Sequence, residues 1–553
     1  MRIIIILLAC TFMLLLGYSA YRGYELWKQG HWMTMAKAYA DRNDPNDEIL
    51  CLKQVLLLNP RNVDACRMMA ILTEAQQSRS SLTFREQVLQ LNPNSLDDRL
   101  ALARTALVFH DIITASNALA GVDDAGRKTA DYFNVAGEYA VACNQPGTAQ
   151  SDFAEASRLD PSNFVPQFNL ATIELRGSNV LDMAEARITL SRISMNSTNI
   201  ILRNEADRQL IGDAMRFRDD NTALSYSSHL VQQTNASFPD KLLRLSVLKL
   251  TGSDGYDPAL ASTESEATDT DTRADMMLWM IRQNLSAQAL AWERTLPASV
   301  QTNVPTEILA TQCQMLLQDW NGVQKSISKQ NWGNLEYTRH AYIARAMRMQ
   351  GLGAASKAEW DVAVKSATQS SDLNALFGFA SQWGWQEEAQ QMLWDIVNAV
   401  PQEQWAGEVL AVSLLQNGDT RPLMQLFSIQ ANRNPADLGI KNNLALTAML
   451  LGEQELNPYD IARDIYQKEP TNSFFACTYA LSLHLQGKNA DALKVMRQLT
   501  PQELEDSERA GYYGVILKAV GDNANASIYL KRSLKGKLLP EERAMFEKAE
   551  SGL

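Results

Sequence analysis

One stretch of this chain is written twice: residues 479–499 read YALSLHLQGKNADALKVMRQL, and residues 513–533 read YGVILKAVGDNANASIYLKRS. Four positions agree at an interval of 34 residues, which pairs Ala480 with Gly514, Leu483 with Leu517, Gly487 with Gly521 and Ala492 with Ala526. Apolar residues at helix spacing run into a glycine turn and resume after it, so each copy is predicted to form two helices. A fixed internal period predicts a stack of units, each of which buries its apolar face on its neighbours.

The same register continues on both sides of these two copies. Upstream it falls on small and apolar residues at Leu376, Phe377, Ala380, Gly384 and Ala389, then Leu410, Ala411, Leu414 and Gly418, then Asn442, Ala445, Leu446 and Met449. Towards the N-terminus it returns at Phe133, Ala136, Gly137, Ala149, Phe153 and Ala156, and it begins at Trp32, Met35, Ala36 and Tyr39. Proline stops the second helix of several early units, and an Asn or Ser follows that can cap the next helix, as in Asn59-Pro60-Arg61-Asn62.

Two helices per unit, small residues where they cross, glycine in the turn and a period of 34 residues resemble the tetratricopeptide repeat. The resemblance implies an all-α fold: a right-handed superhelix, or α-solenoid, of helix-turn-helix repeats. In this family the first helix of each pair lines a concave groove that binds segments of protein partners. The groove positions carried onto this chain are Asn134, Glu138, Arg345, Arg348, Asn374, Glu408, Asn443, His484 and Lys518. A family subset clamps a C-terminal carboxylate, and only Arg345, Arg348 and Asn374 offer similar groups here.

Changes in the register divide the chain into parts. Residues 1–28 are expected to form an N-terminal transmembrane anchor, 29–240 an N-terminal repeat array and 336–539 a C-terminal repeat array. Between the arrays, residues 241–335 are expected to hold divergent helical repeats with a solvated loop at 251–272, where Ser, Thr, Asp and Glu gather. Residues 540–553 are expected to form a C-terminal tail.

The anchor prediction rests on residues 3–20, an apolar run that follows Arg2. As a helix this run would extend about 27 Å, enough to cross a hydrocarbon core. It predicts a single-pass membrane protein with a cytoplasmic N-terminus and extracytoplasmic, periplasmic repeats of bacterial type. A cleaved signal peptide fits the same pattern, and Leu7-Leu8-Ala9-Cys10 resembles a weak lipoprotein signal, so both stay open as alternatives.

The composition bears on the class of partner. The 553 residues carry a net charge of −12 and no cluster of Lys and Arg, so nucleic acid is not an expected partner. The six cysteines show no CxxC spacing. Those after Cys10 are expected to be buried helix residues, with a Cys51–Cys66 disulfide as the alternative. Most tryptophans fall between Trp320 and Trp405 and are expected to fill gaps between helices.

No signature of catalysis fits its context. The five histidines are isolated from one another, and Gly351-Leu352-Gly353 lies between two predicted helices, where it is a repeat turn and no phosphate loop. No catalytic residue, metal site or cofactor is therefore expected. The leading hypothesis is a membrane-tethered scaffold that organises an envelope complex of the secretion, polymer export or pilus type. The alternative is a carbohydrate-active enzyme within residues 240–335, where Glu293 and Glu307 could act as a carboxylate pair.

Overall fold

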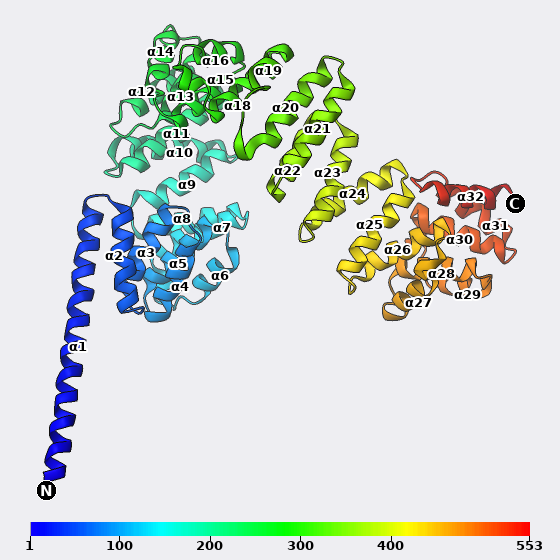
Figure 1. Cartoon of the computed structure of the whole chain (residues 1–553), viewed down its shortest axis with the longest axis horizontal. Coiled ribbons are helices and arrows are strands. Elements are labelled where there is room, and N and C mark those ends of the chain that lie inside the picture. The colour runs from blue at the N-terminus through cyan, green and yellow to red at the C-terminus, as the bar shows by residue number, and fades with distance from the viewer. Residues whose placement is uncertain (1, 553) are drawn as a thin grey trace. The chain divides into compact units, whose positions relative to one another are not determined.

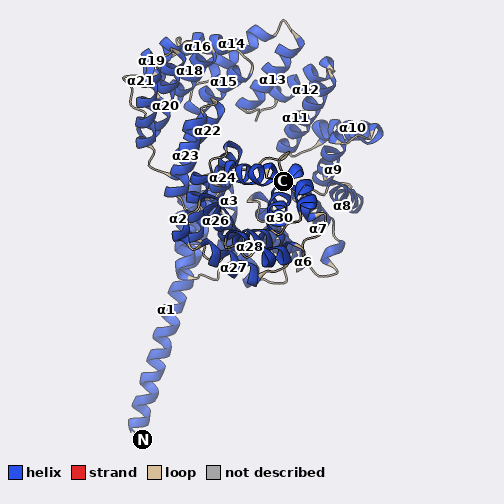
Figure 2. Cartoon of the chain, turned by 90° about the vertical axis from the view of Figure 1, so that its right-hand side faces the viewer, coloured by secondary structure: helices blue, strands red, loops and turns tan. Residues whose placement is uncertain are grey.

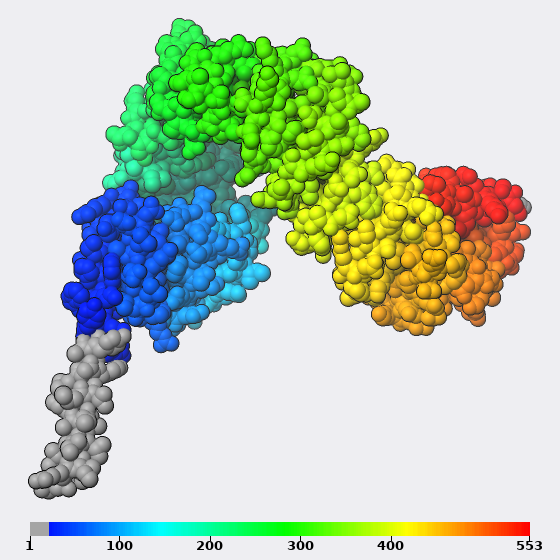
Figure 3. All heavy atoms as spheres, viewed as in Figure 1, coloured from blue at the N-terminus to red at the C-terminus, as the bar shows by residue number. Residues whose placement is uncertain are grey.

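The computed structural model describes the backbone of residues 2–552 and the side chains of residues 22–552. The chain divides into two compact units, Met1–Gln283 and Asn284–Leu553. Figure 1 follows the helices along the chain, and Figure 3 shows the described residues in colour. Over the described residues every regular element is a helix and none is a strand, as Figure 2 also shows. The predicted all-α repeat architecture is confirmed.

The helices of the first unit are α1 (Arg2–Asp41), α2 (Pro45–Leu58), α3 (Val63–Ala75), α4 (Ser80–Leu91), α5 (Leu96–Val108), α6 (Ile112–Ala120), η1 (Gly126–Lys128), α7 (Ala130–Ala142), α8 (Pro146–Leu159), α9 (Phe164–Arg176), α10 (Val180–Asn196), α11 (Ile200–Phe217), α12 (Asp220–Gln232), α13 (Phe238–Thr251), α14 (Tyr256–Glu266) and α15 (Thr270–Arg282). From α1 to α14 they pack as consecutive hairpins, α1 with α2, α3 with α4 and so on. First helices of neighbouring hairpins also touch, as α5 with α7 and α9 with α11 do.

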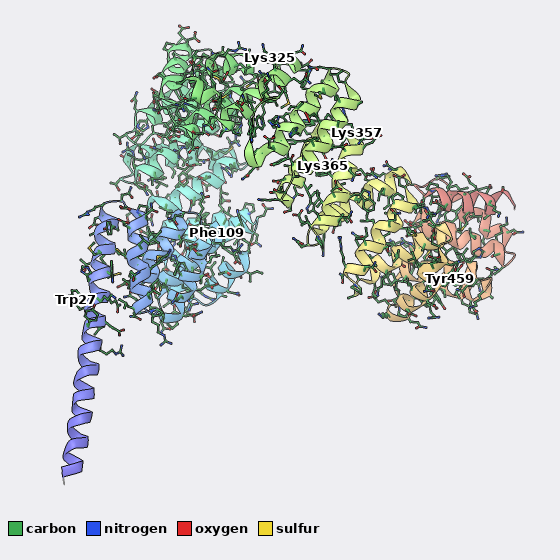
Figure 4. The ribbon with its side chains drawn as sticks, viewed as in Figure 1. Trp27, Phe109, Lys325, Lys357, Lys365 and Tyr459 are labelled. Carbon is green, nitrogen blue, oxygen red and sulfur yellow. The ribbon has the colours of Figure 1, made fainter. Side chains whose placement is uncertain are left out.

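The helices of the second unit are α16 (Ser286–Glu293), α17 (Ala298–Gln301), α18 (Val304–Leu316), α19 (Trp320–Ile327), η2 (Gly333–Leu335), α20 (Glu336–Met349), α21 (Gly353–Ser366), α22 (Ser370–Gln382), α23 (Gln386–Ala399), α24 (Gln404–Asn417), α25 (Thr420–Arg433), α26 (Leu438–Leu451), η3 (Gln454–Leu456), α27 (Pro458–Lys468), α28 (Ser473–Leu485), α29 (Asn489–Met496), η4 (Glu503–Glu505), α30 (Ser507–Ala519), α31 (Asn523–Ser533) and α32 (Pro540–Ser551). Hairpins run from α18/α19 to α30/α31, and first helices α26, α28 and α30 touch in series. Second helices reach solvent: Lys357 and Lys365 project from α21 (Figure 4).

A residue with positive φ ends the first helix of nearly every hairpin. In the second unit glycine holds this place at Gly351, Gly384, Gly418, Gly452, Gly487 and Gly521. In the first unit and at the start of the second, other residues mostly hold it: Asn43, Gln77, His110, Asn144, Arg218, Gly252, Asn284 and Gln318. Left-handed backbone is least costly for glycine, which explains why the sequence marks the turn most clearly towards the C-terminus.

Small residues set the distance between the helices of a hairpin. Ala445, Ala480 and Gly514 occupy the same register position and are buried. A Cβ built on Gly514 would lie 2.8 Å from Cγ of Leu530 and 3.1 Å from its backbone N, so α30 and α31 approach closer than an alanine would permit. In the first unit a Cβ on Gly137 would lie 2.6 Å from the Phe153 ring.

The helix starts predicted after the proline stops are confirmed. Asn62 Oδ1 accepts a hydrogen bond from Ala65 N at 2.9 Å, and Ser95 Oγ accepts one from Asp98 N at 3.2 Å. Asn163 Oδ1 likewise accepts one from Val165 N at 3.0 Å. Each side chain satisfies an amide that the first turn of a helix leaves without an intrahelical partner.

Two expected irregular segments are helical in the structure. The predicted loop at 251–272 contains α14, which Leu260 holds against the fold because its side chain is buried. The Ser, Thr and Asp residues there act as caps: Asp269 Oδ1 accepts from Thr272 N at the start of α15. The expected tail at 540–553 contains α32, whose Phe546 is fully buried. In both cases the polar composition of the sequence predicted an irregular segment, although the segment forms a helix with few but well-buried apolar residues.

The prediction of a single-pass membrane protein with extracytoplasmic repeats is wrong by the structure. Over the part of the chain that it describes, no helix combines the length and the apolar character needed to cross a membrane. In the part of α1 whose side chains are described, the sequence is not continuously apolar. It contains the charged residues Arg22, Glu25, Lys28, Lys37 and Asp41. The run at residues 3–20, on which the prediction rested, lies outside the residues whose side chains are described.

Replacing Gly514 tests whether each hairpin depends on its own close approach. Gly514→Leu forces a branched side chain against Leu530, an overpacking expected to cost about 1–3 kcal/mol. Because each hairpin packs mainly on its neighbours, amide exchange should accelerate over residues 506–552 and stay unchanged in residues 30–240. Hydrogen exchange with mass spectrometry measures this.

The matched control is Gly378→Leu in α22, where a Cβ would meet nothing within 4 Å. It should leave exchange unchanged or slower, because leucine favours helix over glycine. Equal acceleration along the whole chain in Gly514→Leu would instead indicate a single cooperative core.

Candidate functional site

The two predicted groove residues of the first unit join neighbouring repeats to one another. Asn134 on α7 donates from Nδ2 to Glu138 Oε1 at 2.8 Å and accepts from Asn169 Nδ2 of α9 at 3.1 Å. Glu138 lies 3.8 Å from Arg104 Nε of α5, and burial raises the pKa of its carboxyl. These groups therefore form a polar bridge across three first helices.

The two predicted arginines of α20 are held by aromatic rings. Arg345 Cζ lies 4.8 Å from the centroid of the Trp383 ring, and Arg348 Cζ lies 3.7 Å from that of Trp385. Arg348 also forms an ion pair with Glu388 of α23. Trp383 and Trp385 pack edge to face at 5.0 Å, in agreement with the prediction that tryptophans fill gaps between helices.

The other predicted groove residues have separate surroundings. Asn374 Nδ2 donates to Glu403 at 3.1 Å, and His484 Nδ1 lies 2.8 Å from Asn489 Oδ1. Glu408 lines a cavity of about 310 Å³ between α23 and α26. Lys518 Nζ donates to the backbone oxygen of Ala549 in α32. Asn443 lines a different cavity, described next, so the structure does not gather the nine residues into one site.

A short segment of the chain, residues 535–542, crosses the face formed by the first helices of the second unit. We call it the strap. Its Leu539 is buried in the core cluster that contains Leu414 and Leu423 of the α24/α25 hairpin. A Cβ on the turn glycine Gly418 would lie 3.1 Å from Cγ of Pro540. Glu541 accepts a hydrogen bond from Thr420, so the strap reaches from α31 back across three hairpins.

Helix α32 holds the strap in place by seating on α30. A Cβ on Gly511 would lie 2.2 Å from the Phe546 ring. The absence of a side chain at Gly511 therefore creates the space, called here the Gly511 notch, that the ring fills. Phe546 also meets the Tyr512 ring edge to face at 5.2 Å. The Tyr512 hydroxyl donates to Glu542 Oε1, and the backbone N of Leu539 donates to Glu542 Oε2 at 2.9 Å.

A cavity of about 300 Å³ remains between the strap and the first helices. It is lined from α24, α25, α26, α28, α30 and the strap by Leu415, Gln416, Leu423, Phe427, Asn442, Asn443, Leu446, Thr447, Phe474, Cys477, Thr478, Glu508, Arg509, Tyr512, Lys537, Leu538, Leu539 and Glu542. Asn443 and Phe474 are exposed, so the cavity is open to solvent on that side. We take this cavity, which lies wholly within the second unit, as the candidate functional site.

Two polar atoms at this cavity are buried without a partner among the described residues. They are Oδ1 of Asn442, whose residue is only 5% exposed, and Nη1 of Arg509. The rest of the Arg509 guanidinium is fixed, because Nε donates to Glu503 O at 2.8 Å and Cζ lies 4.6 Å from the Phe474 ring centroid. An unpaired buried polar atom is costly, so both atoms favour a polar ligand in the cavity.

The carboxyl groups at the α30 end of the cavity are unusually basic. Burial, with Glu542 and Asp506 nearby, raises the pKa of Glu508 to about 8, against a smaller opposing effect of Arg509. Burial is also the main reason that the pKa of Glu542 is raised and that the pKa of the Cys477 thiol is raised well above its usual value. At neutral pH Glu508 is therefore mostly protonated, and its protonated form is the one that the folded state stabilises.

The sequence contained a signal for Glu508 that the groove positions did not use. In the register that aligns Ala445, Ala480 and Gly514, Glu508 is equivalent to Gly439 and Phe474, so the acid takes the place of two uncharged residues in the preceding repeats. Gly511 is likewise equivalent to Asn442 and Cys477, and it leaves the space that the Phe546 ring fills. Contacts of the strap could not be found this way, because residues 535–542 lie outside the register.

The two carboxylates of the enzyme alternative line one small cavity of about 200 Å³. Glu307 accepts a hydrogen bond from Trp332 Nε1 at 2.8 Å, and burial raises the pKa of both Glu293 and Glu307. Within the described part of the chain, no three His, Cys, Asp or Glu residues cluster as metal ligands would. Cys51 and Cys66 are free, so the alternative disulfide is not formed.

Comparisons with known proteins give fold-level likeness only. No protein-family model and no curated protein matches the chain. Among solved structures, a MamA RS-1 double mutant is 17% identical over 30% of this chain and 95% of its own, with a TM-score of 0.28. Pseudomonas aeruginosa PilF is 14% identical over 41% and 98%, with 0.31, and the Cut9–Hcn1 hetero-tetramer of the APC/C is 12% identical over 92% and 96%, with 0.33. Scores this low carry no argument about family or function.

Removing the Phe546 ring tests whether α32 fixes the strap. Phe546→Ala empties the Gly511 notch, a loss expected to cost about 3–5 kcal/mol locally. The strap should then leave the first helices, and the buried Cys477 thiol should react faster with a maleimide, as mass spectrometry of the labelled peptide can show.

Met545→Ala on the same helix, whose side chain is only partly buried, is the control and should leave Cys477 nearly unchanged. Cys66 serves as an internal reference, because it is fully buried and belongs to the first unit, far in sequence from Phe546. Equal labelling of Cys477 in the wild type and Phe546→Ala would contradict the role given to α32.

Proposed function

We propose that this chain is a protein-binding scaffold of the tetratricopeptide type and that the first-helix face of its second unit accepts a segment of a partner protein. The observation that carries the proposal is the strap: this face already holds a piece of polypeptide through an apolar side chain, a proline and two carboxylates. A surface that binds polypeptide from its own chain has the shape and chemistry to bind it from another.

The strap leaves part of this surface unused. The cavity beside it measures about 300 Å³ and contains the two unpartnered atoms of Asn442 and Arg509. Asn443, one of the predicted groove residues, lines its open side. The other eight predicted residues stay proposals, and several of them would have to give up an intramolecular partner to bind a ligand.

Two finer expectations belong to the same proposal. One is the right-handed superhelical course of the repeats, which rests on the resemblance of the sequence to the tetratricopeptide repeat. The other is membership in an envelope complex of the secretion, polymer export or pilus type, an expectation that came from the apolar sequence of residues 3–20, whose side chains lie outside the described residues. Identification of the partner tests the second.

A photo-crosslinking amino acid placed at Asn443 tests the binding face. Asn443 is exposed at the mouth of the cavity, so crosslinking in cells should give adducts of discrete mass. The matched control places the same amino acid at Lys494, an exposed position on the second helix α29, and should give none. Adducts at Lys494 equal to those at Asn443, or none at either, would argue against a partner on the first-helix face.

A further inference from the structure

One carboxyl at the acidic end of the cavity, that of Glu508, has no partner among the described residues. The Glu508 carboxyl accepts no hydrogen bond and forms no ion pair with any described residue, although Glu542 and Asp506 lie close enough to act on it. Other carboxylates on this face are engaged: Glu542 accepts from Tyr512 and Leu539 N, and Glu541 accepts from Thr420. Glu508 is therefore the one acid at this cavity whose acceptor capacity is open.

The groups around Glu508 oppose its negative charge, so a cation placed beside its carboxyl would be stabilised. Glu542 from α32 and Asp506 at the start of α30 both oppose a negative charge on Glu508, and burial opposes it further. Arg509 is the cation that lowers the pKa of Glu508, but no hydrogen bond or ion pair joins the two side chains: its Nε donates to Glu503 O, its Cζ lies over the Phe474 ring, and its Nη1 has no partner among the described residues. Lys537 of the strap is exposed. A cation placed in the cavity would favour the ionised form of the half-buried Glu508 carboxyl and oppose the effects of burial, Glu542 and Asp506.

A second observation points to a ligand independently of the acids. Asn442 Oδ1, at the α26 end of the same cavity, is a buried acceptor without a donor among the described residues. The apolar side chains of Leu423, Phe427, Leu446 and Leu538 line the same cavity. A ligand that fits has an N–H group for Asn442, an aliphatic stem and a terminal positive charge, which describes a lysine residue in a polypeptide.

We propose that the cavity between the strap and the first helices α26, α28 and α30 is a subsite for a lysine side chain of the partner, with Glu508 as the group that pairs with the ammonium. This inference rests on the proposed function and names the chemistry of its partner segment. The ammonium meets the Glu508 carboxylate, the methylene stem lies on the apolar lining, and a backbone N–H of the partner reaches Asn442. Binding at neutral pH transfers one proton from Glu508 to the solvent, and the ligand's ammonium keeps all of its own.

Calorimetric titration of the full chain with two peptides tests this. The probes are acetyl-Ala-Lys-Ala-amide and its neutral analogue with norleucine in place of lysine, each titrated at pH 7 in buffers of different ionisation enthalpy. The lysine peptide should bind at least about tenfold more tightly than the norleucine peptide. It should release close to one proton per site, because Glu508, with a pKa of about 8, is protonated before binding.

Glu508→Gln should weaken the lysine peptide at least about tenfold and abolish proton release, since glutamine keeps the shape and cannot ionise. Glu505→Gln, an exposed acid in η4 outside the cavity, is the matched control and should change neither quantity. Equal binding of both peptides, binding without proton release, or unchanged binding to Glu508→Gln would each overturn the inference.

The outcomes separate this inference from the proposed function. Crosslinks at Asn443 without lysine selectivity would leave the binding face in place and remove only the lysine subsite. Absence of both would remove the two together.

Discussion

The close approach of two helices within each hairpin is the constraint on which the rest of this structure depends. At Gly514 the approach is so tight that an alanine Cβ would fall 2.8 Å from Leu530, and Gly137 meets Phe153 in the same way in the first unit. Each hairpin then packs its apolar side on the next, and within each unit first helices of neighbouring hairpins touch. The first-helix face exists only because the crossing residues are small, so the candidate site depends on residues that never touch it.

The predictable parts of the fold are those in which the close approach of helices requires small residues at regular positions in the sequence. Ala445, Ala480 and Gly514, with the turn glycines that follow them, fix both the period and the helix ends from about residue 340 onward. The register was weaker in residues 241–335 because Asn284 and Gln318 hold the left-handed turn that glycine marks elsewhere. Composition misled at 251–272, where cap residues such as Asp269 gave a helical hairpin the appearance of a loop.

The candidate site was less predictable, because the repeat register does not show which side chains contact one another. Of the groove positions, Arg348 and Asn374 pair with Glu388 and Glu403, and only Asn443 lines the cavity beneath the strap. That cavity depends on α32, a helix outside the repeats that reaches back to the α24/α25 hairpin through Leu539 and Glu541. The pKa of Glu508 is raised by burial and then by Glu542, a residue of α32. The C-terminal helix thus caps the last repeat and, at the same time, completes the site.

The central claim is that stability and shape arise hairpin by hairpin, and native-state hydrogen exchange of the unmodified chain at increasing denaturant tests it most directly. The account predicts that the amides of each hairpin open as their own group, with free energies that differ along the chain and with the α28–α32 group opening apart from those of the first unit. Convergence of all buried amides from residue 30 to residue 552 on one common opening free energy would contradict it.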